Sequence, residues 1–281
     1  RNCDWSSDVC SSDLPFRRCP MSFFTSRGFP IHYEMVGSGS RVLFFNGSGA
    51  SIEVSRPLID LLAAHHTVLV HDQRGLGLTG VPEGPYEMAD YAADATALLE
   101  HVGWDRTMVF GISFGGMVAL EFAVTHPAIV ERLYLACTSS GGDGGSSYPL
   151  HELALRTEEE RRAMYPTLVD TRFDADWLRD HPNDAALWAS RPAPTGRAAQ
   201  GNGWQLDARS RHDVWNRLGA IDCPTFVASG RFDGIAPLDN GEKLAQAVSG
   251  ARFEAYDGGH MFLFQDRRAF ADLREFLGGV R

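Results

Sequence analysis

The chain has 281 residues, a formal net charge of −10 at pH 7 and 44% hydrophobic residues. This length suits one large domain, or one domain with an insertion, and the apolar content is enough for a full core. No apolar run approaches the roughly 18 residues of a membrane span, and no cluster of Lys and Arg forms the basic patch of a nucleic-acid-binding protein. We therefore expect neither a membrane nor a nucleic acid as partner.

The first twenty residues differ from the rest of the chain. They hold three of the five cysteines and lack both apolar periodicity and the core of a signal peptide. The stretch DWSSDVCSSDL, residues 4–14, back-translates in frame into a widely used sequencing-adapter oligonucleotide. We therefore expect residues 1–20 to be a non-native or disordered segment and Met21 to be the natural start. The remaining cysteines, Cys137 and Cys223, are predicted to be buried structural thiols in a cytoplasmic protein.

From Met21 onward, short apolar runs alternate with amphipathic runs. Strands are predicted where residues alternate or are continuously apolar, over Ile31–Gly37, Arg41–Asn46, Thr67–Asp72, 106–111, Val130–Cys137, Cys223–Gly230 and 251–259. Helical spacing predicts helices over Arg56–His65, Met88–Gly103, 114–127, 238–248 and 266–279. This alternation predicts an α/β fold, with a mostly parallel twisted sheet covered by helices on both faces.

The alternation breaks between residues 138 and 217. Gly-rich loops, charged helical stretches and the Pro-rich run SRPAPTG fill this part of the chain. We expect an α/β core of residues 21–137 and 218–281, interrupted by a helical lid of residues 138–217 after the sixth strand. Such a lid would cover the carboxyl edge of the sheet, where the sites of α/β proteins form.

The run VFGISFGGMVAL, residues 109–120, places one serine between a predicted strand and a predicted helix. The pattern Gly111-x-Ser113-x-Gly115 in this setting is the nucleophile elbow of serine hydrolases. The turn is so tight that residues two positions from the serine must be small. It points the serine Oγ out of the sheet, and the backbone N–H of Phe114 towards an oxyanion at the start of the helix.

A nucleophilic serine needs a base, and the base needs a carboxylate to orient it. His260 follows the last predicted strand in a glycine-flanked loop, in the chain order Ser, Asp, His that the elbow motif requires. Asp233 follows the preceding strand and is the preferred acid. Asp257 and Asp143 are the rival acids, although each also suits an ordinary turn.

The second oxyanion donor is expected from the loop after an early strand. In FFNGSGA, the glycines at 47 and 49 free the backbone, so the N–H of Ser48 can point into the site. Together with the elbow, His260 and Asp233, this loop resembles the α/β-hydrolase family. The turn DQRGLGLT, residues 72–79, also matches that family, and we expect its role to be structural. No catalytic role is assigned to His71 or Asp72.

Within the family, Asn46 stands where many members have a histidine. An Asn there is similar to enol-lactonases of aromatic catabolism, and FNGSGA is similar to intracellular polyhydroxyalkanoate depolymerases. The resemblance implies a cofactor-free, metal-free serine hydrolase that cleaves a small carboxylic ester or lactone through an acyl-enzyme. Carbon–carbon bond hydrolysis, acyl transfer by the same triad, and a non-catalytic ligand-binding protein remain alternatives. Neither the substrate nor the oligomeric state can be read from the sequence.

The lid is rich in tryptophan, which suits an apolar pocket as well as packing onto the core. Trp204, flanked by glycines, and Asn46 are the candidate substrate-pocket residues. Other aromatic candidates are Trp177, Trp188 and Trp215. Arg211 or His212 could bind a substrate carboxylate, although solvated surface positions are the more ordinary role for such residues.

Overall fold

The computed structural model describes residues 22–181 and 195–278. The expectations for residues 1–20 and for Trp188 lie outside the described residues. Within these ranges, no helix is long and apolar enough to cross a lipid bilayer.

Eight strands form one sheet in the order β1-β2-β4-β3-β5-β6-β7-β8. Their bounds are β1 Ser22–Ser26, β2 Phe29–Gly37, β3 Ser40–Phe45, β4 His66–His71, β5 Thr107–Ile112, β6 Val130–Ala136, β7 Thr225–Gly230 and β8 Arg252–Tyr256. β2 runs antiparallel to both β1 and β4, and the six strands from β4 to β8 in this order are parallel. The predicted mostly parallel sheet is confirmed.

The helices of the α/β core are α1 Ile52–Ala63, α2 Met88–Val102, α3 Phe114–Thr125, α8 Leu238–Ala247, α9 Phe262–Gln265 and α10 Arg267–Phe276, with the 3-10 turn η1 Pro127–Ile129. Side chains of each parallel strand alternate between two apolar clusters. Leu43 and Phe45 join α2, α3 and α8 on one face, while Val42 and Phe44 join α1, α9 and α10 on the other. The sheet is therefore buried on both faces, as its continuous apolar strands predict.

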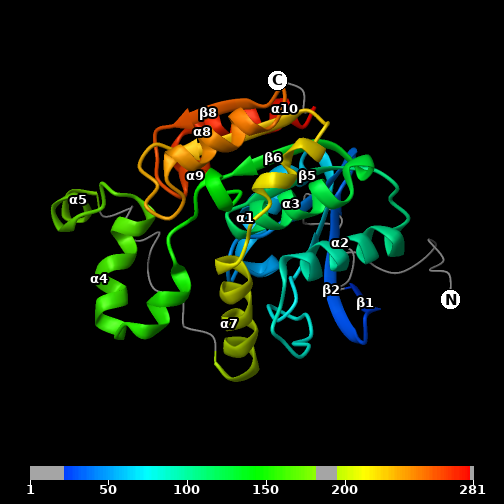
Figure 1. Cartoon of the computed structure of the whole chain (residues 1–281), viewed down its shortest axis with the longest axis horizontal. Coiled ribbons are helices and arrows are strands. Elements are labelled where there is room, and N and C mark those ends of the chain that lie inside the picture. The colour runs from blue at the N-terminus through cyan, green and yellow to red at the C-terminus, as the bar shows by residue number, and fades with distance from the viewer. Residues whose placement is uncertain (1–21, 182–194, 279–281) are drawn as a thin grey trace, which may run out of the picture.

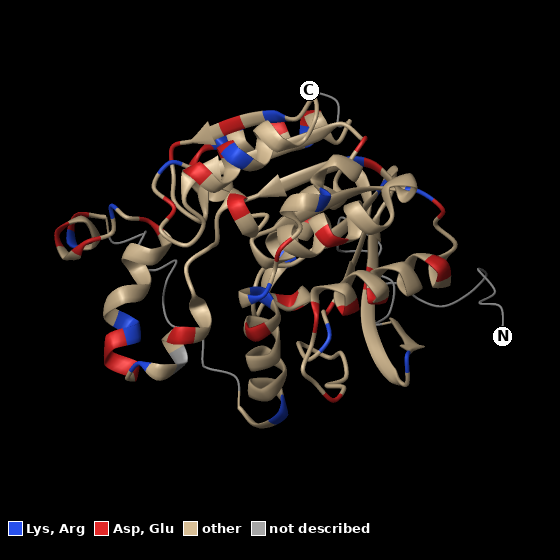
Figure 2. Cartoon of the chain, in the orientation of Figure 1, with Lys and Arg blue, Asp and Glu red and all other residues tan. Residues whose placement is uncertain are grey.

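Between β6 and β7, the described residues form helices and 3-10 turns but no strand. These elements are η2 Gly142–Gly144, η3 Leu150–Leu155, α4 Glu158–Val169, α5 Ala175–Asp180, α7 Gly196–Ser210 and η4 Trp215–Ala220. Figure 1 shows α4 and α5 at one side of the molecule and β1 and β2 at the other. α4 begins with three acidic residues, which two arginines follow (Figure 2), and most of its residues are exposed or half-buried.

One strand is not predicted from the sequence: the short β1, which pairs with β2 as a hairpin. Several predicted boundaries shift by a few residues, most of all the start of α1. α1 begins at Ile52 instead of Arg56, because Ser51 caps it by accepting a hydrogen bond from the Val54 N–H.

Candidate active site

Ser113 occupies the sharp turn between β5 and α3. Its backbone has φ 54° and ψ −118°, a conformation that costs a non-glycine residue roughly 1–3 kcal/mol. A Cβ placed on Gly111 would lie 2.4 Å from the carbonyl oxygen of Gly115, and one on Gly115 would lie 2.0 Å from the carbonyl oxygen of Phe45. The glycines on either side of Ser113 are therefore required by close backbone packing.

Gly115→Ala is expected to lower the free energy of unfolding by about 3 kcal/mol or more, because backbone atoms rather than a flexible side chain would have to move. Gly203→Ala in α7 is the matched control. A Cβ there would meet no described atom within 4 Å, so that change should stabilise the helix by up to about 1 kcal/mol. Urea denaturation of both variants measures the difference. Wild-type stability in Gly115→Ala would contradict this account of the turn.

The structure brings Ser113, His260 and Asp233 into one hydrogen-bonded chain. His260 Nε2 lies 2.9 Å from Ser113 Oγ, and His260 Nδ1 lies 2.7 Å from Asp233 Oδ2. The other oxygen of Asp233 accepts the backbone N–H groups of Ile235 and Ala236, each at 2.8 Å. Because a carboxylate only accepts, Nδ1 carries the proton of the neutral ring and Nε2 accepts from the serine hydroxyl.

The environment of His260 favours proton uptake. Burial by itself lowers the pKa of the imidazole, but Asp233, through its charge and the hydrogen bond that it accepts, and the nearby Cys137 together outweigh burial, so the pKa of His260 lies well above its usual value of 6.5. The Asp233 side chain has no exposed surface, while that of His260 is 13% exposed. The ring can therefore meet a ligand while its carboxylate partner is shielded from water.

The two rival acids lie elsewhere. Asp257 is 70% exposed and pairs with Arg172, whose Nη1 is 2.9 Å from its carboxylate. Asp143 is exposed in η2. Of the three aspartates considered from the sequence, only Asp233 is hydrogen-bonded to His260.

The predicted oxyanion donors come from two segments that meet at Ser113. β3 and β5 are adjacent parallel strands, so the loop after β3 lies beside the elbow after β5. A Cβ placed on Gly47 would lie 3.7 Å from the Cβ of Ser113. Phe114 begins α3, where the first N–H groups have no acceptor within the helix. Ser48 and Phe114 thus flank the nucleophile from different strands.

Two buried glutamines join α7 to this loop. Gln205 Oε1 accepts the backbone N–H of Gly49 at 2.8 Å, and Gln205 Nε2 donates to Gln73 Oε1 at 3.0 Å. Gln73 Nε2 then donates to the backbone carbonyl of Asn46 at 2.9 Å. Both ends of the loop that carries Ser48 are therefore held by side-chain amides. No local sequence pattern indicates this chain of hydrogen bonds, because Gln205 is 156 residues away from Gly49.

Gln205→Leu is expected to lower kcat of the ester hydrolysis proposed below by about tenfold or more, since it removes both hydrogen bonds of the Gln205 amide and a loss of about 1.4 kcal/mol corresponds to a factor of ten. KM should stay within about threefold, because the change loosens the loop and removes no substrate contact. Gln200→Leu, at an exposed position of the same helix, is the matched control. Steady-state kinetics of both variants test the assignment, and a change in KM alone would refute a positioning role.

The turn over residues 72–79 is hydrogen-bonded to several other segments of the chain. Asp72 accepts hydrogen bonds from His32 Nδ1 at 2.8 Å and from the backbone N–H groups of Ile52 and Leu78 at 2.7 and 2.9 Å. Arg74 Nε and Nη2 bind the two carboxylate oxygens of the buried Asp94, each at 2.8 Å. Every one of these contacts joins parts of the core, in keeping with the structural role expected of the turn.

Cys137 lies closer to the candidate triad than the sequence suggests. It is buried, as predicted, and it directly follows β6 with φ 43°. Its Sγ and the ligand atoms of Asp233 and His260 all lie within 4.8 Å of one another. Among the described residues these three could geometrically hold a metal ion, yet both ring nitrogens of His260 already hydrogen-bond to Asp233 and Ser113. The sequence offers no signal for this proximity, since it depends on how β6 and β7 pair.

The loop of His260 rests on the end of α4. The backbone N–H of His260 donates to the Val169 carbonyl at 2.6 Å, and a Cβ on Gly259 would lie 2.1 Å from that same oxygen. The fully buried Asp170 accepts from Gln265 Nε2 at 2.9 Å, on the far side of the loop. The segment between β6 and β7 therefore contacts both the His260 loop and the loop that carries Ser48.

The candidate pocket residues have different surroundings. The Trp204 ring packs 5.0 Å from that of Tyr86, and a Cβ on Gly84 would lie 2.5 Å from the indole; the indole therefore packs against the core. Asn46 is fully buried, and neither atom of its side-chain amide has a hydrogen-bond partner among the described residues. Trp177 stacks on His181, with ring centroids 4.1 Å apart.

The two residues considered for carboxylate binding also differ. Arg211 is 41% exposed and joins α7 to the core through the Tyr86 carbonyl and Glu87, at 2.9 and 3.1 Å. His212 is buried, which corrects the expectation of a solvated surface position. Burial lowers the pKa of His212 to about 4, so the ring is neutral, and its Nε2–H donates to the Ser139 carbonyl at 3.2 Å.

The chain is similar to known proteins over most of its length. A family model described as alpha/beta hydrolase fold matches residues 40–267. The chain is 30% identical to a poly(3-hydroxyalkanoate) depolymerase of Ectopseudomonas oleovorans, over 83% of this chain and 82% of that protein. It is 23% identical to 3-oxoadipate enol-lactonase 2 of Acinetobacter baylyi, over 88% and 92%.

Among solved structures, the enol-lactonase of Burkholderia xenovorans LB400 superposes with a TM-score of 0.77 at 26% identity, covering 91% of this chain and 99% of that one. The family match spans most of the chain and includes Ser113 and His260. The chain therefore belongs to the alpha/beta hydrolase fold family.

Proposed function

We propose that this hydrolase is a cofactor-free serine esterase or lactonase with Ser113 as nucleophile, His260 as general base and Asp233 as the orienting acid. The observation that carries the proposal is the hydrogen-bonded chain from Ser113 Oγ through His260 to Asp233, on a backbone turn strained in the manner of a nucleophile elbow. A purely structural serine requires neither the strain nor a buried base.

In the proposed reaction, Ser113 Oγ attacks the carbonyl carbon of an ester or lactone while His260 Nε2 takes the hydroxyl proton. The N–H groups of Ser48 and Phe114 bind the oxyanion, aided by the positive end of the α3 dipole. The intermediate collapses, the alkoxide leaves with the proton from His260, and an acyl-enzyme remains. His260 then activates water, which releases the acid and restores Ser113.

We further propose that residues 138–217 act as a lid over the core of residues 21–137 and 218–281. The contacts of Val169 with the His260 loop and of Gln205 with the Ser48 loop support this division. The side-chain amide of Asn46, at the start of the loop that carries Ser48, has no hydrogen-bond partner within residues 22–181 and 195–278, which makes it a candidate substrate contact. Ester and lactone substrates are also in keeping with the names of the relatives, a depolymerase of a polyester and two enol-lactonases.

Rapid mixing with p-nitrophenyl acetate tests the proposal. If deacylation is slow, equal amounts of acyl-enzyme and p-nitrophenolate should form in an initial burst. If deacylation is fast, added hydroxylamine should trap the acyl group. Steady-state rates with short p-nitrophenyl esters, with lactones and with vinylogous diketones then separate ester cleavage from carbon–carbon cleavage. Turnover of diketones alone would replace this reaction with the carbon–carbon alternative. Ligand binding without any turnover would identify a binding protein.

A further inference from the structure

Arg209 is a buried cation with two free donors. It lies in the last turn of α7 and is 5% exposed. Its Nη1 donates to the Tyr148 carbonyl at 2.7 Å, but its Nε and Nη2 have no hydrogen-bond partner in residues 22–181 and 195–278. A charged group buried without partners is strongly destabilising. This arrangement therefore indicates that a ligand accepts hydrogen bonds from the two free donors of the guanidinium.

The guanidinium keeps its charge at neutral pH. Burial lowers the pKa of Arg209 to about 10, and the charge of Asp233 opposes that decrease. No ion pair joins Arg209 to an acidic residue in the described part of the chain. Arg211, two positions further on, pairs with Asp207 and Glu87 instead.

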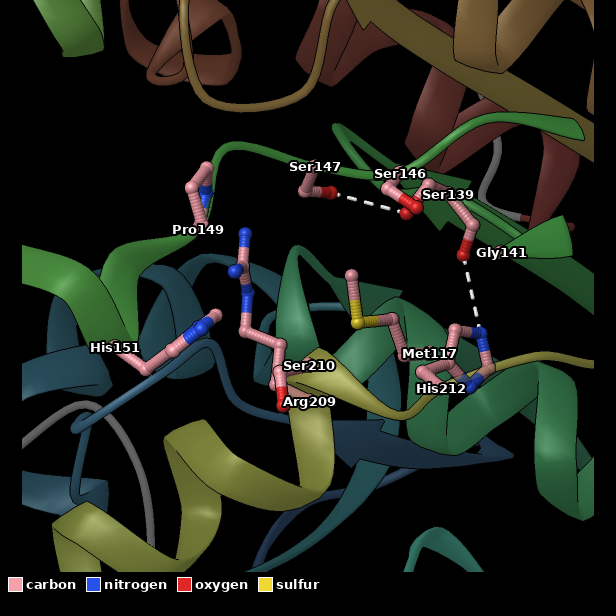
Figure 3. A pocket seen from close by; sticks show the side chains of 10 residues that line it. All are labelled: Met117, Ser139, Gly141, Ser146, Ser147, Pro149, His151, Arg209, Ser210 and His212. Carbon is pink, nitrogen blue, oxygen red and sulfur yellow. Dashed lines mark hydrogen bonds between the residues drawn. The ribbon is translucent and has the colours of Figure 1, made fainter.

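The Arg209 side chain lines a cavity of about 110 Å³, and its two free donors are buried beside it. Figure 3 shows the Arg209 side chain rising from α7 towards Ser147 and Pro149, opposite Met117. Ser139 and Ser147 line the same cavity, and their hydroxyls are hydrogen-bonded to each other at 3.0 Å, so the pair leaves one further O–H donor. The ten lining residues include no Asp or Glu. The cavity therefore offers an anion one positive charge and several donors, with no opposing carboxylate.

The cavity adjoins the candidate triad. Met117 lies one turn after Ser113 in α3, and its N–H donates to the Ser113 carbonyl at 3.2 Å. The N–H of Tyr148, the residue that Arg209 holds, donates to the carbonyl of Ile235 at 2.7 Å, and the Ile235 N–H in turn binds Asp233. The walls of the cavity are thus built on the segments that position the triad, although Ser113 and His260 do not line it.

The free edge of Arg209 has the shape that a carboxylate fits. Nε and Nη2 present two parallel N–H groups, the fork that binds both oxygens of a carboxylate. Elsewhere in this chain, the same edge of Arg74 binds both oxygens of Asp94 at 2.8 Å. Arg209 offers an equivalent edge without its partner.

We propose that Arg209 binds a carboxylate of the substrate, so that the enzyme selects esters or lactones whose acyl or alcohol part carries a free carboxylate. This inference rests on the proposed function, because the anion is placed on the substrate of Ser113. It places the carboxylate on Arg209 rather than on Arg211 or His212, the two residues that the sequence suggested as possible: Arg211 is 41% exposed, and the neutral His212 lines the cavity.

The test compares charged and neutral substrates of equal length. p-Nitrophenyl monoesters of glutaric, adipic and pimelic acid carry a terminal carboxylate, and their ω-amides are the neutral partners. 4-Carboxyphenyl acetate and 4-carbamoylphenyl acetate place the carboxylate and its neutral amide on the alcohol side of the ester. In the wild type, at least one charged member should exceed its neutral partner in kcat/KM by about tenfold or more. In Arg209→Gln this ratio should fall by about 10- to 100-fold, as expected for loss of a charged hydrogen-bonded pair.

Arg211→Gln is the matched control and should leave the ratio within about threefold of wild type. If Arg209→Gln does not fold, the test is inhibition of p-nitrophenyl acetate hydrolysis by the wild-type enzyme. Adipate should then inhibit at least about tenfold more strongly than its monoamide. Equal inhibition, or no charge preference on either side of the ester, would overturn the proposal. If Ser113→Ala left p-nitrophenyl acetate turnover unchanged, the proposed function itself would fail, which is a separate result.

Discussion

Ser113→Ala and His260→Ala are each expected to lower kcat/KM for p-nitrophenyl acetate by about 10⁴-fold or more. The first change removes the attacking oxygen, and the second removes the base 2.9 Å from it. Groups that act as one unit are not additive, so the double variant should be about as slow as either single variant. The residual rate would come from the oxyanion donors and from binding.

Matched controls exclude a general effect of substitution. Ser55→Ala on α1 and His65→Ala at an exposed position after it should retain wild-type rates. Circular dichroism and thermal unfolding confirm that each variant is folded. An additive loss in the double variant would mean that Ser113 and His260 act in separate steps.

Asp233→Asn is expected to lower the plateau of kcat/KM by about 10⁴-fold and to shift its pH profile. An amide in this position can hold the ring in the wrong tautomer, with the proton on Nε2. His260 acts as a base only when neutral, so activity in the wild type is lost as pH falls through a pKa raised above 6.5. Without the charge of Asp233 that pKa falls, so the acidic limb of the residual activity should move to lower pH.

Asp257→Asn is the control for this experiment, because Asp257 is exposed and contacts Arg172 rather than the ring. Its rate should stay within about threefold of wild type, with an unchanged pH profile. The measurement is kcat/KM from about pH 5 to pH 9 for the wild type and both variants. An acidic limb that stays in place in Asp233→Asn would show that Asp233 does not set the pKa of the catalytic base.

The features that the sequence predicts well are those that local chemistry dictates. Short apolar runs such as 106–111 and 130–137, set between helical patterns, favour buried strands, and the glycines around Ser113 are needed wherever a strand turns so sharply into a helix. Chain order then places His260 and Asp233 in loops after strands. Because those strands are parallel and adjacent, the loops converge at one edge of the sheet.

The features that the sequence could not predict depend on contacts between distant segments. The hydrogen bonds from Gly49 to Gln205 and from His260 to Val169 each join residues far apart in the chain. Arg209 and Arg211 are the same residue type, two positions apart at the C-terminal end of α7, so the sequence does not distinguish them. Only the packed structure shows that one is buried with free donors while the other pairs with exposed carboxylates.

Treatment with a fluorophosphonate, followed by mass spectrometry of the tryptic peptides, tests the central claim most directly. The reagent phosphonylates an activated serine and mimics the tetrahedral intermediate. We predict one adduct per chain, located on Ser113, whose formation stops ester hydrolysis and is absent in Ser113→Ala and strongly slowed in His260→Ala. Labelling and turnover that persist in Ser113→Ala would contradict the assignment of Ser113 as the nucleophile.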